Sequence, residues 1–421
     1  MSVDVETLIK DLTARRFWGV LELKFQAGRV TTVRKTETLE PQISNTARGH
    51  GQNFGGSTMS STPLVELRAE ISKWLSIPSE DLDLIDFCLA VYVSQRMPGD
   101  PLWGMIIDAS GGGKTELLRA FRGHPDAYFL SKLTEKSLIS GYRDPDSPRD
   151  PSLLPELDGK VLIVKDLAPI LQMRRESRNK ILADFRDAYD GFSDNATGTL
   201  GKITYQARFT FLVACTLAVE RFDCVEQELG ERMVRFRARG QASLSKTRRA
   251  IQGIGGDEPM RDEMRRLIGN FLAPLDSFPT QVPEKLVEPL ARLSDFTAKA
   301  RSHVQRDRRG DLQYLPRPEV GTRLGKELGK LLLALSVVRG KPEPDEADFA
   351  MVQRVADDSI PPNRLAVIQA LRREPMQLSE VRAATNLPYS TAHRVLDDLR
   401  VLGIVAGEGD PENLVWSLVS D

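Results

Sequence analysis

Short apolar runs alternate with segments of helical periodicity through the middle of this chain. The five runs expected to form strands are, in chain order, 105–107, Ala127–Leu130, Val161–Val164, 209–214 and 233–236. Residues 174–189 lie between the third and fourth runs and carry apolar side chains at helical spacing. Strands that alternate with helices in this way indicate a parallel sheet. The pattern therefore predicts an α/β fold.

Helical patterns stand on both sides of this region. Two helices, at Pro63–Leu75 and 79–96, precede the first strand, and Pro-Gly-Asp-Pro at 98–101 breaks the chain before that strand begins. From residue 261 the chain turns helical again. These segments are expected to pack around the sheet.

The amino-terminal part has a different pattern. Residues 3–16 suit an amphipathic helix, and the alternation in 17–25 and 29–36 predicts a β-hairpin. This α+β module, residues 1–40, is too small for a large core of its own and is a candidate docking or dimerisation element. The next segment, 41–62, is rich in Gly, Ser, Thr, Asn and Gln, which indicates a flexible linker.

The last sixty or so residues form a third pattern. Helices at 362–373, 378–385 and 390–402 are followed by two short strands at 403–406 and 414–418. This is the spacing of a winged helix-turn-helix. Arg400 is expected to lie nearer the DNA backbone, and the residues expected to face the major groove are Tyr389, Ser390, Thr391, His393 and Arg394. Winged helices also dock proteins, and the acidic wing (Glu408, Asp410, Glu412) favours that alternative.

The turn after the first strand carries the main chemical signal. Asp-Ala-Ser-Gly-Gly-Gly-Lys-Thr at 108–115 joins a strand to a helix, which is the context of a phosphate-binding P-loop. Glycine N–H groups converge on phosphate oxygens, Lys114 reaches the β- and γ-phosphates, and the Thr115 hydroxyl holds Mg²⁺. The usual pattern has glycine at 108, whereas the Asp108 carboxylate can repel a triphosphate. The residues expected to bind ATP are Ser110, Gly111, Gly112, Gly113, Lys114, Thr115 and Glu116.

Polar residues at two strand ends extend this site. Asp166 ends the third strand, where a carboxylate is expected to organise Mg²⁺ together with Thr115. Lys165 precedes it in place of the usual acidic pair, so Asp166 either serves the metal or acts as the base, and as a further alternative it caps the next helix. Thr216 ends the fourth strand and is the candidate to orient the attacking water, or it is an ordinary strand-end threonine.

The order of these motifs resembles the AAA+ ATPases. A P-loop, an acidic strand end, a polar strand end and then Leu-Gly-Glu-Arg at 229–232 before a fifth strand look most like the branch shared by mini-chromosome-maintenance helicases. Other segments resemble putative ATP-binding proteins of phages and bacterial mobile elements. These segments read Gly-Asp-Pro-Leu-Trp at 99–103, Leu-Ile-Ser-Gly-Tyr at 138–142, Leu-Leu-Pro-Glu-Leu at 153–157 and Arg-Asp-Ala-Tyr-Asp-Gly at 186–191. The resemblance covers about residues 63–358.

This resemblance implies an AAA+ core at 63–240 and a helical lid region at 241–358, followed by the winged helix-turn-helix that the spacing predicts at 359–421. It also implies a homo-oligomeric ring in which Arg232 is the arginine finger that reaches a neighbour's γ-phosphate. A salt bridge to Glu228 or Glu231 is the alternative for Arg232.

Two further basic residues match positions in the resembled proteins. Arg323 matches the second sensor arginine, or it is a solvated arginine at a helix start. A turn at 197–202 matches a hairpin that touches DNA in the channel of the ring. Lys202 at its tip would contact phosphate, unless this is a plain surface hairpin.

Composition limits the partners. The chain has 421 residues with 58 basic and 59 acidic side chains, a net charge of −1, so DNA binding must come from local patches. No apolar run approaches 18 residues and no leader pattern is present, so we expect a cytoplasmic protein without a membrane partner. The cysteines Cys88, Cys215 and Cys224 are expected to be buried thiols, since they lack metal-site spacing.

Three functions follow from these patterns. The first is a ring-forming motor or helicase-related ATPase that uses ATP and Mg²⁺ and acts on DNA. The second is an ATP-gated, DNA-binding regulator or loader in which Asp108 and Lys165 weaken or abolish turnover. The third is a scaffold that recruits protein partners through the winged helix or the N-terminal module.

Overall fold

The computed structural model describes residues 19–26, 29–37, 63–109, 111–140, 150–197, 201–221, 231–240, 244–307, 309–410 and 413–419. The chain forms two compact units, Met1–Met59 and Ser60–Asp421. In the first, β1 (Gly19–Gln26) pairs antiparallel with β2 (Arg29–Glu37), as the alternation predicts. The helix expected at 3–16 and the linker at 41–62 lie outside the described residues.

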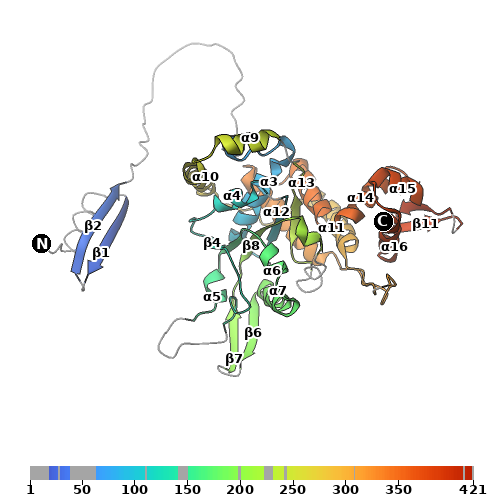
Figure 1. The fold of residues 1–421 in the computed structure, drawn as a ribbon, viewed down its shortest axis with the longest axis horizontal. Helices are drawn as coiled ribbons and strands as arrows, with labels where there is room; N and C mark the ends of the chain where they lie inside the picture. Colours follow the sequence, from blue (N-terminus) through green and yellow to red (C-terminus); the bar gives the residue numbers. More distant parts are fainter. Residues whose placement is uncertain are drawn as a thin grey trace, which may run out of the picture. The chain divides into compact units, whose positions relative to one another are not determined.

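A five-stranded parallel sheet forms the centre of the second unit (Figure 1). Its strands are β3 (Trp103–Ile107), β4 (Ala127–Leu130), β5 (Val161–Val164), β8 (Thr210–Cys215) and β9 (Val234–Arg237). They lie in the order β4-β5-β8-β3-β9, and every neighbouring pair is parallel. The predicted α/β class and parallel sheet are therefore confirmed, with strand bounds within two residues of the expected ones.

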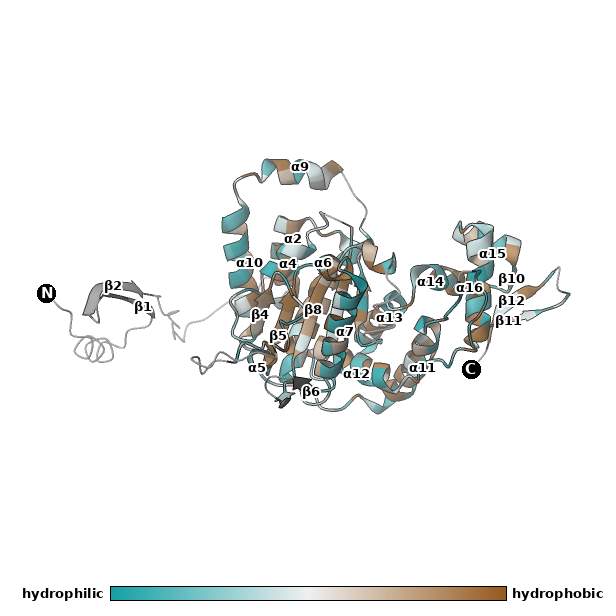
Figure 2. Ribbon diagram, turned by 60° about the horizontal axis from the view of Figure 1, so that its bottom comes forward, coloured by the Kyte–Doolittle hydropathy of each residue, from teal (hydrophilic) through white to brown (hydrophobic). Residues whose placement is uncertain are grey.

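The sheet has an apolar core on each face. Ile106 faces one core, with helices α3 (Asp83–Val93) and α12 (Thr322–Val338), whereas Met105 and Ile107 face the other. This division follows from the two-residue period of a strand. Figure 2 shows the strands as a largely apolar layer between more polar helices. Gly104 allows α3 to approach β3 closely, because a Cβ there would lie 2.8 Å from Cγ2 of Val91.

Helices cover both faces of this sheet. Those before and within the sheet region are α2 (Pro63–Leu75), η1 (Ser79–Asp81), η2 (Ser94–Arg96), α4 (Lys114–Arg119), α5 (Leu154–Leu157), α6 (Ala168–Leu171), α7 (Arg175–Tyr189) and η3 (Leu217–Arg221). Those after it are α9 (Leu244–Gln252), α10 (Asp257–Leu272), α11 (Glu284–Arg301), α12 and α13 (Glu346–Asp358). No helix in the described part of the chain has the length and apolar character needed to span a membrane.

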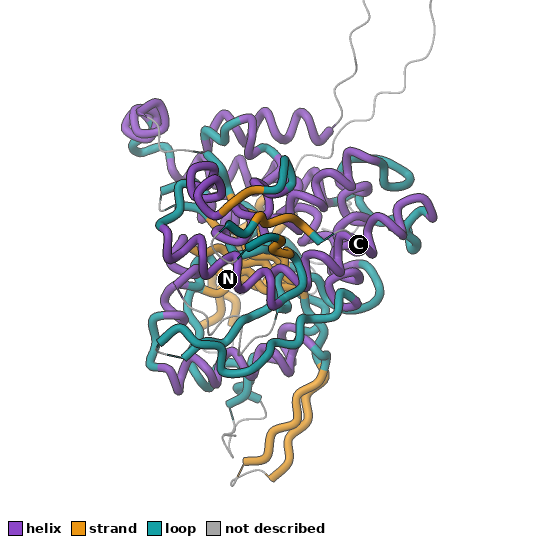
Figure 3. Tube along the Cα trace, turned by 90° about the vertical axis from the view of Figure 1, so that its right-hand side faces the viewer, coloured by secondary structure: helices purple, strands orange, loops and turns teal. Residues whose placement is uncertain are grey.

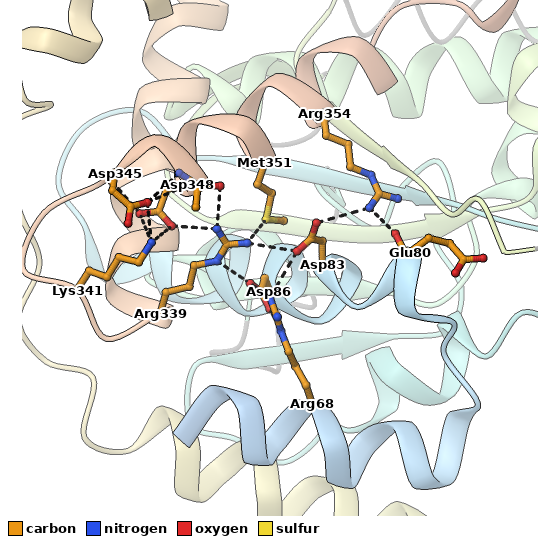
Figure 4. Close-up of polar contacts among 11 residues, drawn as sticks. Arg68, Glu80, Asp83, Asp86, Arg339, Lys341, Asp345, Asp348, Met351 and Arg354 are labelled. Atoms are coloured by element: carbon orange, nitrogen blue, oxygen red, sulfur yellow. Dashed lines mark hydrogen bonds and ion pairs between the residues drawn. The ribbon is translucent and has the colours of Figure 1, made fainter. Parts of the chain in front are cut away.

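A network of ion pairs fixes the later helices to the early ones (Figure 4). Arg339, after α12, donates to Asp86 of α3 at 2.8 Å and to Asp348 of α13 at 3.0 Å. Arg68 of α2 donates to the same Asp86 carboxylate at 2.7 Å. Both aspartates are fully buried, and a buried charge of this kind is stable only when it is paired. The helical region after 240 is therefore packed into the same unit as the sheet.

The carboxyl-terminal part has the predicted helix-turn-helix arrangement (Figure 1). Its elements are α14 (Pro362–Leu371), β10 (Met376–Gln377), α15 (Leu378–Thr385), α16 (Tyr389–Val401), β11 (Val405–Glu408) and β12 (Val415–Leu418). Asn386 adopts a left-handed φ of 56° between α15 and α16, which ends α15 and makes the turn. The first wing strand begins two residues later than expected, because Gly403 at φ 73° still closes α16. The two-residue strand β10, which pairs with β12, was not predicted.

Candidate functional site

The glycine-rich loop follows β3 directly. Gly111 and Gly113 have φ values of 81° and 89°, a region that glycine enters without steric cost. Lys114 is buried, and its Nζ donates to the carbonyl oxygens of Asp108 at 3.0 Å and Ala109 at 2.7 Å. These bonds hold the ammonium inside the loop and use two of its three N–H donors. Ser110 lies outside the described residues.

The Asp108 carboxylate faces this loop. It is buried, and its Oδ1 accepts the N–H of Ala109 at 2.6 Å. A Cβ at Gly112 would lie only 1.6 Å from Oδ2 of Asp108, so the carboxylate packs against the Gly112 backbone. A negative charge therefore lies immediately beside the loop atoms expected to contact phosphate.

The polar strand ends lie beside the loop. Strand β8 lies between β3 and β5, so Thr216 follows a strand flanked by the P-loop strand and the Asp166 strand. Burial, together with the Asp166 charge, raises the pKa of the Cys215 thiol to about 11, and the Lys114 charge opposes that shift. Because both charges act on one thiol, Lys114 and Asp166 lie close to the same strand end.

The two strand-end side chains make local hydrogen bonds. Oδ1 of Asp166 accepts the N–H of Ala168 at 2.9 Å. This is the contact expected if Asp166 caps the helix that follows. The Thr216 hydroxyl accepts the N–H of Ala218 at 3.4 Å, a weak bond. Among the described residues, no hydrogen bond or ion pair engages Oδ2 of Asp166.

The side chains at this end of the sheet fit Mg²⁺ bound with a nucleotide. Thr115 and Asp166 are both half-buried and offer a hydroxyl and a carboxylate. Mg²⁺ usually takes one or two protein oxygens, with phosphates and water completing its shell. Over the described residues, no group of three or more His, Cys, Asp or Glu side chains could hold a metal by itself.

Glu116 has a different environment from the other predicted ATP-binding residues. Its carboxylate accepts from Arg261 at 2.8 Å and also pairs with Arg119. Burial alone would raise the pKa of Glu116, but the two arginines hold it below its ordinary value. The side chain thus joins α4 to α10, so only its backbone remains a candidate phosphate contact.

A cleft opens beside the loop glycines. Its volume is about 480 Å³, within the range of small-molecule sites, and Gly111, Gly112 and Gly113 form one wall. Trp74 at the end of α2 and Arg249 of α9 line it as well. Sequence reasoning placed neither residue at the nucleotide site. An apolar residue in an amphipathic helix is expected in the core, and only the fold shows that Trp74 is partly exposed at this cleft.

The two predicted catalytic arginines form a second cluster. Arg232 is 12% exposed, its Cζ lies 5.4 Å from the ring centroid of Tyr189, and its Nη2 lies 3.3 Å from Oδ2 of Asp190. Burial lowers the pKa of Arg232, and the nearby Arg323 charge lowers it further. Arg323 begins α12 and lies 3.9 Å from Glu319. The two guanidinium groups are therefore neighbours.

Neither of the two glutamates that the sequence offered as salt-bridge partners, Glu228 and Glu231, is the partner that the described residues show for Arg232. Glu228 lies outside the described residues, and the Glu231 carboxylate lies 3.8 Å from Arg301 instead. The carboxylate that pairs with Arg232 belongs to Asp190, which is distant in sequence.

This arginine cluster lies at the opposite end of the strands from the P-loop. Val234 pairs with Gly104 near the start of β3, and Tyr189 stacks edge-on against Trp103 at 5.0 Å. Strand β3 runs from Trp103 to Ile107, four steps or about 13 Å, before the loop begins. Within one subunit, Arg232 and Arg323 are thus separated from Lys114 by the length of the sheet.

A hairpin of β6 (Phe192–Thr197) and β7 (Gly201–Gln206) projects from the body at the bottom of Figures 1 and 3. The sequence predicted Lys202 at the tip of this hairpin. It lies instead within β7, where it pairs with Ala196 of β6. The residues of the tip, 198–200, lie outside the described part. The Lys202 ammonium lies 2.8 Å from the Asp194 carboxylate, so phosphate contact would require that exposed pair to exchange.

Helix α16 presents the predicted DNA-contacting side chains. Ser390, His393 and Arg394 are exposed and Thr391 is half-buried, whereas Ala392 and Val395 face the core. By contrast, Arg400 pairs with Asp397 at 2.6 Å.

The surface around α16 adds a further basic residue and an acidic wing. Arg382 of α15 lies over the Tyr389 ring at 5.6 Å, which adds a basic residue that sequence reasoning did not select. In the wing, Glu408 and Asp410 are exposed, and Glu412 lies outside the described residues.

Comparison with known proteins agrees with the helix-turn-helix assignment of the C-terminal part. The IclR helix-turn-helix domain model matches residues 365–409, which span α14 to the first wing strand. No curated protein matches the chain. The chain thus combines a mixed α/β unit around a parallel sheet with a C-terminal region similar to the IclR helix-turn-helix domain, a similarity that favours DNA binding.

Proposed function

We propose that this protein is an ATP-gated, DNA-binding regulator or loader. Mg·ATP binds in the cleft beside Gly111–Gly113, and the helix-turn-helix binds DNA through the exposed face of α16. The observation that carries the proposal is that one chain combines a strand–glycine loop–lysine site with a region similar to the IclR helix-turn-helix domain. A P-loop domain of AAA+ type is part of this proposal.

The nucleotide half rests on chemistry at one end of the sheet. The Lys114 ammonium is fixed in the loop, the loop glycines border an open cleft, and Asp166 and Thr216 follow neighbouring strands. Lys114 would take the β- and γ-phosphates, Thr115 and Asp166 would hold Mg²⁺, and Thr216 would orient a water molecule. Trp74 offers an aromatic face to the base, since base–aromatic stacking is favourable.

Two observations favour gating over rapid turnover. The Asp108 carboxylate lies against the loop, where its charge opposes the phosphate charge. Arg232 is held against Tyr189 and Asp190 of its own chain, and a finger in this position must leave that contact before it reaches a nucleotide. Both effects slow hydrolysis without preventing ATP from stabilising one conformation.

A second candidate, a ring-forming motor, is favoured by the position of the arginines. Arg232 and Arg323 lie at the opposite end of β3 from Lys114, so either arginine would act on the nucleotide of a neighbouring subunit. Repeating that contact head to tail generates a ring if the rotation closes. The projecting β6–β7 hairpin would then carry Lys202 toward DNA in the channel.

One measurement separates these functions. DNA affinity is measured by fluorescence anisotropy on random-sequence duplexes, with and without Mg·ATP, while phosphate release is followed in the same samples. A regulator or loader changes DNA affinity on ATP binding with slow release, and Lys114→Ala removes the change. A motor shows release stimulated by DNA. If ATP alters neither DNA affinity nor release, and wild type binds ATP no better than Lys114→Ala, the proposed function fails.

A further inference from the structure

A groove lies between helices α11 and α12, which pack side by side (Figure 2). Its volume is about 540 Å³, within the range of small-molecule sites. Aliphatic side chains line most of it, among them Val282, Val287, Leu290 and Leu333. Among the described residues, none lines both this groove and the cleft at the P-loop. The fold therefore holds a hollow of ligand size outside the proposed nucleotide site.

Two glycines of α12, Gly325 and Gly329, lie one helical turn apart and line the groove. A Cβ at Gly325 would lie 3.6 Å from Oγ of Ser294. A Cβ at Gly329 would lie 3.6 Å from Cδ2 of Leu290. Both are ordinary contacts, so the approach of α11 does not require glycine at either position. Because glycine inside a helix is less stable than alanine, these two residues keep the groove open at the expense of helix stability.

Lys330 of α12 brings a positive charge to this groove. Its side chain lines the groove, and the residue is 8% exposed. Its Nζ donates to the backbone carbonyl oxygens of Asp100 at 2.5 Å and Gly99 at 3.4 Å. These bonds use two of the three N–H donors of the ammonium. Within the described ranges, no carboxylate forms an ion pair with Lys330, and the Asp100 carboxylate pairs with Lys326 instead, at 3.1 Å.

The surroundings of the Lys330 ammonium are positive on balance. Arg208 and Lys326 add two cations, whereas Asp100 is the carboxylate of this set. Burial, together with the Arg208 charge, lowers the pKa of Lys330 to about 8, and the Asp100 charge opposes that shift. A buried charge is stable when it is paired, so an anion in the groove would stabilise the charged form of Lys330.

The carboxyl group of Glu327, which also lines the groove, is directed toward Tyr189. Glu327 is 2% exposed, and its Oε1 accepts the Tyr189 hydroxyl at 2.6 Å. Burial raises the pKa of Glu327 to about 7, and the charges of Arg301 and Arg323 oppose that shift. Glu327 is not among the charges that shift the pKa of Lys330. It therefore does not serve as the counter-ion of Lys330, and the groove favours a negatively charged ligand.

We propose that the α11–α12 groove binds a small organic acid with an apolar body. The acid group accepts the third N–H of the Lys330 ammonium, and the body lies against the aliphatic walls at Val287 and Leu290. A wholly apolar molecule would leave the Lys330 charge unpaired, and an inorganic anion would leave the walls in contact with water. The proposal goes beyond ATP-gated DNA binding, because this site needs neither the P-loop nor α16.

Two fluorescent probes with the same ring skeleton test this site. Anilinonaphthalene sulfonate carries an acid group, and N-phenylnaphthylamine is the same skeleton without it. Both probes become brighter in an apolar site, so each is titrated into the full-length protein at neutral pH, with and without Mg·ATP. Wild type should bind the sulfonate saturably, and Mg·ATP should not displace it, because ATP is expected in the cleft at the P-loop.

Lys330→Met removes the charge and keeps an unbranched apolar stem. Affinity for the sulfonate should fall at least about tenfold, whereas affinity for the neutral probe should stay within about twofold, since a hydrogen bond to a charged group is among the stronger ones. Lys285→Met is the matched control, because Lys285 is an exposed lysine of α11 outside the groove lining, and it should bind both probes like wild type. Val287→Asp places a carboxylate on the wall, at a position that is 43% exposed, and should weaken both probes.

Melting temperatures check that each variant folds. Lys330→Gln removes the charge and can still donate to the backbone carbonyl oxygens, so it should lose the sulfonate as Lys330→Met does. This second variant decides the outcome if Lys330→Met does not fold.

The contradicting outcomes are distinct. If wild type shows no saturable binding of the sulfonate, the groove is not a site for such an acid. If both charge-removing variants weaken the two probes equally, or weaken neither, Lys330 does not select an anion and the inference is wrong. If the sulfonate binds Val287→Asp like wild type, or Mg·ATP displaces it, the probe occupies another site and the inference is again wrong. ATP-gated DNA binding is judged separately by the anisotropy measurement.

Discussion

The carboxylate of Asp108 packs against the backbone of Gly112, and a Cβ at Gly112 would lie 1.6 Å from its Oδ2. This contact links the departure from the usual P-loop pattern to the shape of the loop itself. It explains why glycine is required at 112, and it places a negative charge where phosphate is expected. The same carboxylate also accepts the N–H of Ala109, so it has a structural part as well as an electrostatic one.

Asp108→Gly should tighten Mg·ATP binding about tenfold, because two charges about 4 Å apart near a protein surface repel by up to ~4 kcal/mol before solvent compensation. Calorimetric titration of ATP measures the change. Asp108→Asn is the matched control, since it removes the charge and keeps the shape. Tighter binding in both variants assigns the effect to charge. Tighter binding in Asp108→Asn with weaker binding in Asp108→Gly would show that the Ala109 contact, which asparagine can keep, matters more than the repulsion.

Asp166→Asn should keep ATP binding and lose most of whatever turnover wild type shows. The change removes the charge at nearly constant shape, and the bond from the Ala168 N–H to Oδ1 can persist. Phosphate release and nucleotide affinity are measured on the same preparation. Unchanged release would move the catalytic carboxylate elsewhere, and a loss of thermal stability would instead favour the helix-start role.

Arg394→Ala should weaken DNA binding about tenfold, the effect of losing one base or phosphate contact. Arg400→Ala, on the same helix, should have a smaller effect, because Asp397 already pairs with Arg400. Anisotropy on duplex DNA at two salt concentrations separates a phosphate contact from a base contact, because only the loss of a phosphate contact reduces the salt dependence of binding. Equal affinity for wild type and Arg394→Ala would favour the protein-docking role of the winged helix.

The stability of the subunit should depend on pH through Glu327. Burial raises the pKa of this carboxyl from 4.5 to about 7, so the folded state favours the protonated form. The stabilisation is complete below pH 4.5 and is lost as pH rises toward 7. The melting temperature of wild type relative to Glu327→Gln should therefore fall over that interval, measured at low protein concentration. A constant difference would mean that Glu327 stays ionised in the folded subunit.

Sequence reasoning succeeded where the signal is local. The run Val161–Val164 is uninterrupted by polar residues and forms a strand with the predicted bounds, and the spacing after 362 gave the helix-turn-helix. It was less successful where a contact joins residues that are far apart in the sequence. The partner of Arg232 is Asp190, brought near only by the packing of α7 against the sheet. Lys202 was placed at a hairpin tip because strand pairing, which sets the tip, is not readable from composition.

The last prediction concerns the arginine at the opposite end of the sheet. If Arg232 acts on a neighbour's nucleotide, Arg232→Ala should bind ATP normally and hydrolyse it on the order of 10³ to 10⁵ times more slowly, the range found for arginine fingers. Lys114→Ala should not bind ATP, since it loses the ammonium fixed in the loop. Mixing the two should restore activity, because one interface in the mixture joins an intact loop to an intact Arg232. If mixed oligomers form but activity does not recover, Arg232 does not act on a neighbour's nucleotide. Its role is then confined to the contacts with Tyr189 and Asp190 in its own subunit.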